Sequence, residues 1–307
     1  MEKGVMMKKY KKASMMLLLL VLCFTLTACM GRRSEEGALS LDGSSETSEA
    51  GTAFLNGSSE TGEAGNTVAE KITISENSPV RIAVIDTGFS TRAIAAEHIA
   101  EGKNYLDALV STEDTYGHGT AVASVILQYA PEVQLVPLIS SAYEDGHIRQ
   151  VDADTLAQIL RDAVDIYGCQ VINISAGLKE DNETLKAAVE YVQKRGALLV
   201  ASAGNDYVEN GTVNYYPAAY DSVLAVGALN ADETEIADFS QRGNWVDIYA
   251  PGQNISVKTL SGASKTGDGT SYAAARVSGE AAVLWKNHPD MTAQQIRENL
   301  TQTWSME

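Results

Sequence analysis

The feature that most constrains the fold is a series of five short apolar runs that alternate, from about residue 71 onward, with segments of helical period. The runs are rich in Val, Ile and Ala, and they lie at Val80–Ile85, Val133–Ile139, Val171–Ser175, Ala197–Ala201 and Val223–Val226. The segments of helical period are Ala121–Tyr129, Asp154–Tyr167, Glu183–Lys194, Ala273–Lys286 and Thr292–Thr301. Strands that are apolar on both faces and alternate with helices are typical of a parallel sheet covered on both sides. We therefore predict that residues 71–307 form one three-layer α/β domain, in which helices flank a mostly parallel central sheet.

The first 28 residues have the pattern of an export signal. A basic head containing five lysines precedes an apolar run, Met15–Leu26, that is too short to span a bilayer comfortably. The run ends in Leu26-Thr27-Ala28-Cys29, which resembles the lipobox of bacterial lipoproteins. That resemblance implies that residues 1–28 are removed, that Cys29 is acylated, and that the protein is lipid-anchored in the cell membrane and faces the outside of the cell. An ordinary signal peptide followed by an unmodified cysteine is the alternative.

Residues 29–70 are rich in Gly, Ser, Thr and Glu and poor in large apolar side chains. The heptapeptide Leu41–Thr47 returns with one difference as Leu55–Thr61. Two copies are too few for a repeat architecture, and such a composition favours a flexible chain. We expect a tether that joins the lipidated Cys29 to the folded domain.

The cysteine count and the net charge narrow the possible partners. Cys23 would leave with the signal and Cys29 would carry lipid, so Cys169 would be the last thiol and no intrachain disulfide could form. The formal net charge of −17 argues against a nucleic-acid partner. The sequence does not determine the oligomeric state, and we expect a monomer.

Four short segments carry reactive side chains at places where a strand or helix begins or ends. Asp86 lies at the carboxyl end of the first predicted strand, directly after Ile85, and His118 lies between two glycines at the start of a helix. Asn205 follows the fourth predicted strand, and Ser271 stands at the head of a helix, where it could also act as a cap. A carboxylate, an imidazole, a hydroxyl and an amide donor are the groups that acyl transfer requires.

These segments resemble the subtilases, serine proteases whose catalytic residues occur in the order Asp, His, Ser. Further matches occur in the expected order at Val171–Gly177, Tyr216–Tyr220 and Phe239–Gly243. The resemblance implies a subtilisin-like fold and a serine endopeptidase that acts on extracellular proteins or peptides without a cofactor.

The resemblance also implies a role for each residue. Ser271 would be the nucleophile, His118 the general base and Asp86 the group that orients the imidazole. Asn205 would stabilise the oxyanion. The substrate-binding residues would be Ser175, Ala176, Gly177, Ala203, Gly204, Asp206 and Tyr215. Because Asp206 adds charge and Tyr215 adds bulk, we expect a basic or a small side chain before the scissile bond.

Two other functions are compatible with part of this pattern. Asp86-Thr87-Gly88 alone could belong to an aspartic protease, but such enzymes need two carboxylates and the sequence has one copy. A catalytically silent surface lipoprotein could keep the same fold as a binding scaffold. No spacing of His, Cys or acidic residues suggests a metal site, and the helix after His118 continues where many subtilases insert a calcium-binding loop.

Overall fold

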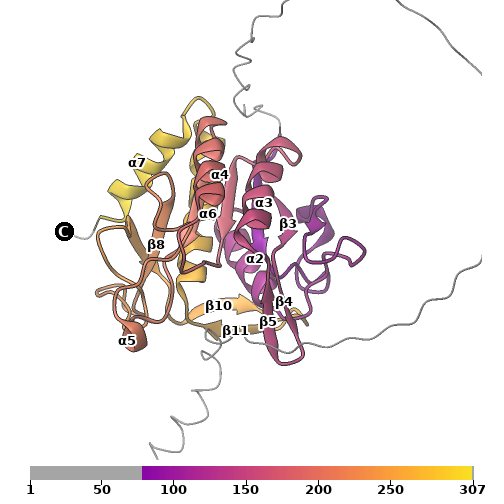
Figure 1. Cartoon of the computed structure of the whole chain (residues 1–307), viewed down its shortest axis with the longest axis horizontal. Coiled ribbons are helices and arrows are strands. Elements are labelled where there is room, and N and C mark those ends of the chain that lie inside the picture. Colours follow the sequence, from indigo (N-terminus) through magenta and orange to yellow (C-terminus); the bar gives the residue numbers. More distant parts are fainter. Residues whose placement is uncertain (1–77, 306–307) are drawn as a thin grey trace, which may run out of the picture. The chain divides into compact units, whose positions relative to one another are not determined.

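The structure is a computed structural model, and it describes residues 78–305 (Figure 1). The predicted signal peptide at 1–28, the predicted lipid attachment at Cys29 and the predicted tether at 29–70 lie outside the described residues. Between residues 78 and 305, no helix combines the length and the apolar character needed to cross a membrane.

A seven-stranded sheet has the strand order β2-β3-β1-β6-β7-β8-β9. Every neighbouring pair in it is parallel. The strands are β1 Arg81–Asp86, β2 Lys103–Asn104, β3 Gln134–Ile139, β6 Val171–Ile174, β7 Leu198–Ser202, β8 Leu224–Leu229 and β9 Ile248–Pro251. Because the strands run in one direction, their carboxyl ends share one edge of the sheet, where ligand sites of open α/β sheets are found.

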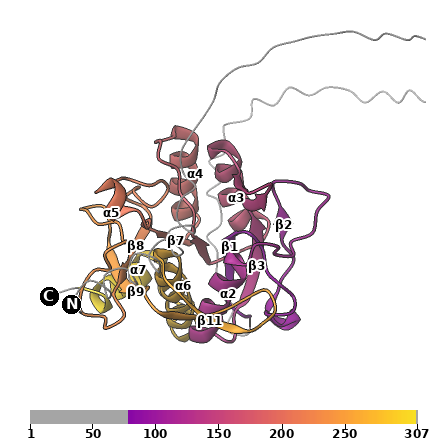
Figure 2. The ribbon, with the colours of Figure 1, turned by 90° about the horizontal axis from the view of Figure 1, so that it is seen from below.

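Helices cover both faces of this sheet, as Figure 2 shows, with α3 and α4 on one side and α2 and α6 on the other. The helices are α2 His118–Tyr129, α3 Ala153–Asp165, α4 Glu183–Lys194, α6 Thr270–Asn287 and α7 Ala293–Thr303, together with the short η1 Ala96–His98 and α5 Tyr207–Asn210. The prediction of a three-layer α/β domain with a mostly parallel sheet is therefore confirmed.

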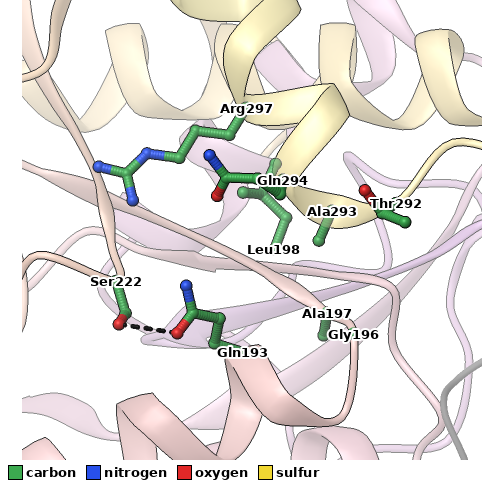
Figure 3. A pocket seen from close by; sticks show the side chains of 9 residues that line it. All are labelled: Gln193, Gly196, Ala197, Leu198, Ser222, Thr292, Ala293, Gln294 and Arg297. Atoms are coloured by element: carbon green, nitrogen blue, oxygen red, sulfur yellow. Dashed lines mark hydrogen bonds between the residues drawn. The ribbon is translucent and has the colours of Figure 1, made fainter.

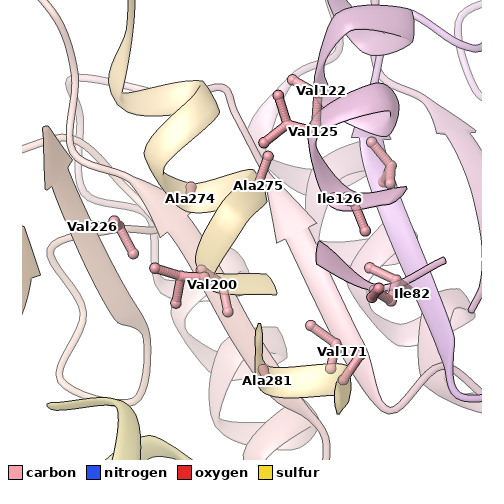
Figure 4. Packing of buried hydrophobic residues seen from close by; sticks show 14 of the residues in the cluster. Ile82, Val122, Val125, Ile126, Val171, Val200, Val226, Ala274, Ala275 and Ala281 are labelled. Carbon is pink, nitrogen blue, oxygen red and sulfur yellow. The ribbon is translucent and has the colours of Figure 1, made fainter. Parts of the chain in front are cut away.

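The apolar strands explain why both faces are covered. In β1, Ile82 and Val84 belong to the core cluster that includes α2 and α6, whereas Ala83 and Ile85 belong to the cluster that includes α3 and α4. Figure 4 shows the first cluster, in which valines of the sheet lie against the small residues of α6. Small side chains such as Ala274 allow the long helix α6 to approach the sheet closely.

All five predicted strands and all five predicted helices occur in the structure, with the predicted bounds at α4 and with shifted ends elsewhere. The largest shifts are at the start of α2, at the start of α6 and at the end of β8, which lie at His118, Thr270 and Leu229 rather than at Ala121, Ala273 and Val226. Two hairpins were not predicted, β4–β5 at Ser141–Glu144 and His147–Gln150, and β10–β11 at Ile255–Lys258 and Ser264–Gly267. Both hairpins are largely exposed, so they lack the buried apolar runs by which the central strands were recognised.

Candidate active site

Asp86 and His118, which are 32 positions apart in the sequence, form a hydrogen-bonded pair. The Nδ1 atom of His118 lies 2.8 Å from Oδ1 and 2.9 Å from Oδ2 of Asp86. Asp86 is the last residue of β1, an inner strand of the sheet, and only 4% of it is exposed. Since a carboxylate only accepts hydrogen bonds, Nδ1 carries the proton. In the neutral imidazole, Nε2 is then free to accept one.

The start of α2 lies directly against the end of β1 because Gly119 has no side chain. A Cβ atom at Gly119 would lie 2.4 Å from the carbonyl oxygen of Gly88 and 3.2 Å from Oδ1 of Asp86. The backbone N–H of Gly119 instead donates a 2.9 Å hydrogen bond to Oγ1 of Thr87. The glycine after His118 thus allows the imidazole to reach the carboxylate.

The pKa of His118 is raised above the ordinary histidine value. Burial of the ring lowers this pKa, but the negative charge of Asp86 and its hydrogen bond raise it by more. Asp114 adds a smaller upward effect, and the positive charge of Lys265 on β11 a smaller downward one. The pair is therefore arranged to stabilise an imidazolium ion.

Asp114 was not singled out from the sequence, yet it organises the loop that leads to His118. Its Oδ1 accepts hydrogen bonds from the Thr87 hydroxyl and from the backbone N–H groups of Tyr116 and Gly117. Its Oδ2 accepts from the backbone N–H and the hydroxyl of Thr120. It replaces the missing side-chain cap of α2, whose N-cap residue is Gly117. An aspartate four residues before a histidine that opens a helix was the only indication in the sequence.

Ser271 is the second residue of α6, and it is 6% exposed. It does not cap the helix, because the N-cap position is taken by Gly269. The neighbouring Tyr272 ring has its centroid 6.3 Å from that of His118, so the amino end of α6 lies beside the imidazole. Burial, together with smaller effects of Asp86 and Asp268, raises the pKa of Tyr272 to about 12, so this phenol stays neutral at ordinary pH.

Asn205 is held next to Ser271 by its side-chain oxygen. Oδ1 accepts hydrogen bonds from the backbone N–H and the hydroxyl of Thr270, at 2.8 and 2.9 Å. Because a backbone N–H can only donate, it fixes the orientation of the amide, and Nδ2 faces the other way. A Cβ atom at Gly269 would lie 3.6 Å from that Nδ2 and 3.8 Å from the backbone nitrogen of Ser271. Two N–H donors therefore flank one region at the positive end of α6.

The expected substrate-binding residues follow the ends of two neighbouring strands. Ser175, Ala176 and Gly177 come directly after β6, and Ala203 and Gly204 come directly after β7. β6 and β7 pair in parallel, so these two segments leave the same edge of the sheet side by side. Asp206 and Tyr215 are joined by a 2.5 Å hydrogen bond from the phenol to the carboxylate.

A separate pocket lies at the opposite ends of the strands (Figure 3). It is lined by residues around the amino end of β7 and the amino end of α7, including Leu198, Ala293 and Arg297. None of the reactive side chains lies in it, so it belongs to a different part of the molecule. Among the described residues, no group of three or more His, Cys, Asp or Glu side chains is placed to hold a metal ion.

An acid–base pair beside a hydroxyl and two convergent N–H donors can perform acyl transfer. In comparisons with known proteins, the profile of the Subtilase family matches residues 77–306. Subtilisin BL of Lederbergia lenta is 34% identical to this chain over 232 residues, which cover 74% of this chain and 83% of the relative.

Solved structures agree with that match. The S41 psychrophilic protease superimposes with a TM-score of 0.64 at 27% identity, over 73% of this chain and 82% of its own. Sphericase gives a TM-score of 0.62 at 28% identity, over 77% of this chain and 86% of its own. Both share the α/β arrangement around a parallel sheet.

Proposed function

Because the chain belongs to the subtilase family and is a subtilisin-like serine endopeptidase, we propose that Asp86, His118 and Ser271 form its catalytic triad. The observation that carries this assignment is the pair of hydrogen bonds between His118 and Asp86 beside the amino end of α6. Peptide bonds of proteins or peptides are the proposed substrates.

In the proposed reaction, Oγ of Ser271 attacks the carbonyl carbon of the scissile peptide bond. Nε2 of His118 accepts the hydroxyl proton and then delivers it to the leaving amine. Asp86 holds the protonated nitrogen Nδ1 and stabilises the imidazolium that forms between these two transfers. Water, activated by the same imidazole, then hydrolyses the acyl-enzyme and restores the Ser271 hydroxyl.

The oxyanion of the tetrahedral intermediate would lie between two N–H donors, Nδ2 of Asn205 and the backbone N–H of Ser271. Their convergence near Gly269 supports this assignment. Thr270 anchors the amide of Asn205 before substrate arrives, so the donor needs no rearrangement during the reaction.

The site of action is part of the same proposal. Residues 1–28 and the cysteine at position 29 support export and lipid anchoring, so the protease would act outside the cell near the membrane surface. Cys29→Ala should release the protein from the membrane fraction, whereas Cys169→Ala, which changes a buried thiol, should leave it there. Retention of the Cys29→Ala protein in the membrane fraction would contradict lipid anchoring.

The triad is tested with the purified chain and a mixture of unmodified peptides whose cleavage is followed by mass spectrometry. The parent and a Ser261→Ala control, altered at an exposed serine of the β10–β11 turn, should cleave peptide bonds. Ser271→Ala should lose this activity by several orders of magnitude while it melts at a similar temperature. Undiminished cleavage by Ser271→Ala would refute the assignment.

A further inference from the structure

The side chain of Tyr215 fills the crevice between the segment after β6 and the segment after β7. A Cβ atom at Gly204 would lie 2.8 and 3.0 Å from two carbons of the Tyr215 ring. A Cβ atom at Gly177 would lie 3.1 Å from the Cβ of Tyr215. The ring thus occupies the space that the two glycines leave open, and only 8% of the residue is exposed.

The backbone next to Tyr215 is fixed to one wall of this crevice. Tyr216 and Leu178 exchange two backbone hydrogen bonds of 2.8 Å and form an isolated antiparallel bridge. Tyr215 therefore cannot move away without disrupting this bridge or rotating its side chain out of the crevice.

The phenol end of Tyr215 is held by Asp206. The carboxylate of Asp206 accepts hydrogen bonds from the Tyr215 hydroxyl at 2.5 Å, from Nε2 of Gln241 at 2.8 Å and from Nδ2 of Asn210 at 2.6 Å. The Nζ atom of Lys179 lies 4.0 Å from the same carboxylate and 5.8 Å from the centre of the Tyr215 ring.

These contacts also set the charge states of the two groups. Burial raises the pKa of Asp206, but the hydrogen bonds from Tyr215, Gln241 and Asn210 lower it by more, so the carboxyl stays ionised. Burial, together with Asp206, raises the pKa of Tyr215, so the phenol stays protonated and continues to donate. A hydrogen bond to an ionised acceptor is stronger than one between neutral groups.

The substrate residue before the scissile bond must enter next to this ring. Its carbonyl oxygen would face Nδ2 of Asn205, and Asn205 is bonded directly to Gly204 and Asp206 in the chain. The Cα atom of that substrate residue is bonded to the reacting carbonyl carbon. Its side chain therefore begins beside Gly204, where the space is taken by Tyr215.

We propose that Tyr215, held by Asp206, restricts the residue before the scissile bond to Gly, Ala or Ser. This inference rests on the proposed function, and it narrows the expectation of a basic or a small residue to a small one. A larger side chain would have to displace the ring from its crevice and break its hydrogen bond to Asp206. A basic side chain gains little, because that carboxylate already accepts from three side chains and lies near Lys179.

The test uses peptides that differ only in the residue before the scissile bond, with Gly, Ala, Ser, Leu, Phe or Lys at that position. For the parent, kcat/KM for Ala should exceed that for Phe or Lys by about 100-fold or more, the discrimination that a filled pocket can supply. Tyr215→Gly should raise the ratio of kcat/KM for the Phe peptide to kcat/KM for the Ala peptide by about the same factor. Tyr215→Phe keeps the ring but loses the hydrogen bond to Asp206, so its preference for Ala over Phe should lie between those of the parent and of Tyr215→Gly, and it serves as the matched control for removal of the ring.

Equal cleavage of the Phe and Ala peptides by the parent would overturn the inference. An unchanged ratio of kcat/KM for the Phe and Ala peptides in a Tyr215→Gly protein that melts like the parent would also overturn it. If Tyr215→Gly does not fold, the same ratio measured for Tyr215→Ser, together with the preference of the parent, tests the inference instead.

A fluorophosphonate probe, which carries no amino-acid side chain next to its reactive group, separates the proposed catalytic triad from the proposed restriction by Tyr215. A parent that is labelled at Ser271 but cleaves all six peptides equally contradicts only the restriction by Tyr215. A folded parent that is neither labelled nor active contradicts the proposed function, and the restriction with it.

Discussion

The side-chain oxygen of Asn205 accepts a 2.8 Å hydrogen bond from the backbone N–H of Thr270, a residue 65 positions later in the chain. This contact joins the segment after β7 to the first turn of α6. It directs Nδ2 of Asn205 to the same region as the backbone N–H of Ser271. Both donors of the proposed oxyanion site are thus positioned by tertiary structure before any substrate binds.

Replacing the donor should slow the chemical step rather than weaken binding. We expect Asn205→Ala to lower kcat by about 10²–10³ with little change in KM, because this hydrogen bond strengthens as charge develops on the oxygen. Steady-state kinetics on a peptide with Ala before the scissile bond provide the measurement. Asn299→Ala, on the exposed face of α7, should keep the parent's kcat. A loss confined to KM would indicate a role in ground-state binding instead.

The activity should depend on pH through His118. His118 accepts a proton only when neutral, and Asp86 outweighs the effect of burial and raises the pKa of the imidazole. The value of kcat/KM should therefore rise with pH through a midpoint above the ordinary histidine value of about 6.5.

Removing the charge of Lys265 should shift this pH midpoint in a defined direction. Since Lys265 lowers the pKa of His118, Lys265→Gln should move the rise in kcat/KM to higher pH. The matched control is Lys258→Gln, on the partner strand of the same hairpin. A shift to lower pH in Lys265→Gln would contradict the assignment of His118 as the base.

Asp114 should act as a positioning residue with a measurable electrostatic effect. Both carboxylate oxygens of Asp114 accept hydrogen bonds, whereas an asparagine at this position has only one oxygen that can accept. We therefore expect Asp114→Asn to lower the free energy of unfolding by about 1–3 kcal/mol. The pH midpoint of kcat/KM should fall, because Asp114 raises the pKa of His118. Urea unfolding and a pH profile test both effects, with Asp232→Asn on an exposed turn as the control. A destabilised variant with an unchanged midpoint would limit Asp114 to a structural role.

Gly119 should tolerate no side chain. In Gly119→Ala the new methyl group would overlap the carbonyl oxygen of Gly88 and press against Asp86. We expect a loss of about 1–3 kcal/mol in the free energy of unfolding, together with a lower kcat, because α2 must shift away from β1. Thermal melting and kinetics measure these effects, and a variant with parental stability and activity would show that the contact can relax.

The central sheet could be predicted because its strands are apolar on both faces and so form continuous runs, as in Val171–Ile174. β2, with two residues, and β9, which contains only one strongly β-favouring aliphatic side chain, give no such run. The β4–β5 hairpin carries exposed polar and charged residues. A run of β-favouring apolar side chains is what marks a strand in the sequence, so strands that lack such a run are missed, whether they are exposed, like β4 and β5, or buried, like β9.

The sequence also predicted the main residues of the candidate site, but not all of their contacts. Asp86, His118, Asn205 and Ser271 stand in short segments with characteristic neighbours, and the structure places His118 against Asp86 and Asn205 against Thr270. The contacts of Asp114 and the position of the Tyr215 ring depend on segments that are distant in sequence. The sequence identified Tyr215 as bulky and Asp206 as acidic, but not that each is the other's partner.

The central claim is that Ser271 is a nucleophile activated by His118, and fluorophosphonate labelling of the purified chain tests it most directly. Labelling should be found at Ser271 by peptide mapping, should be absent in Ser271→Ala, and should be strongly slowed in His118→Ala. It should persist in the Ser261→Ala control. A folded parent that remains unlabelled, or label on another residue, would contradict the assignment of this site as the catalytic centre.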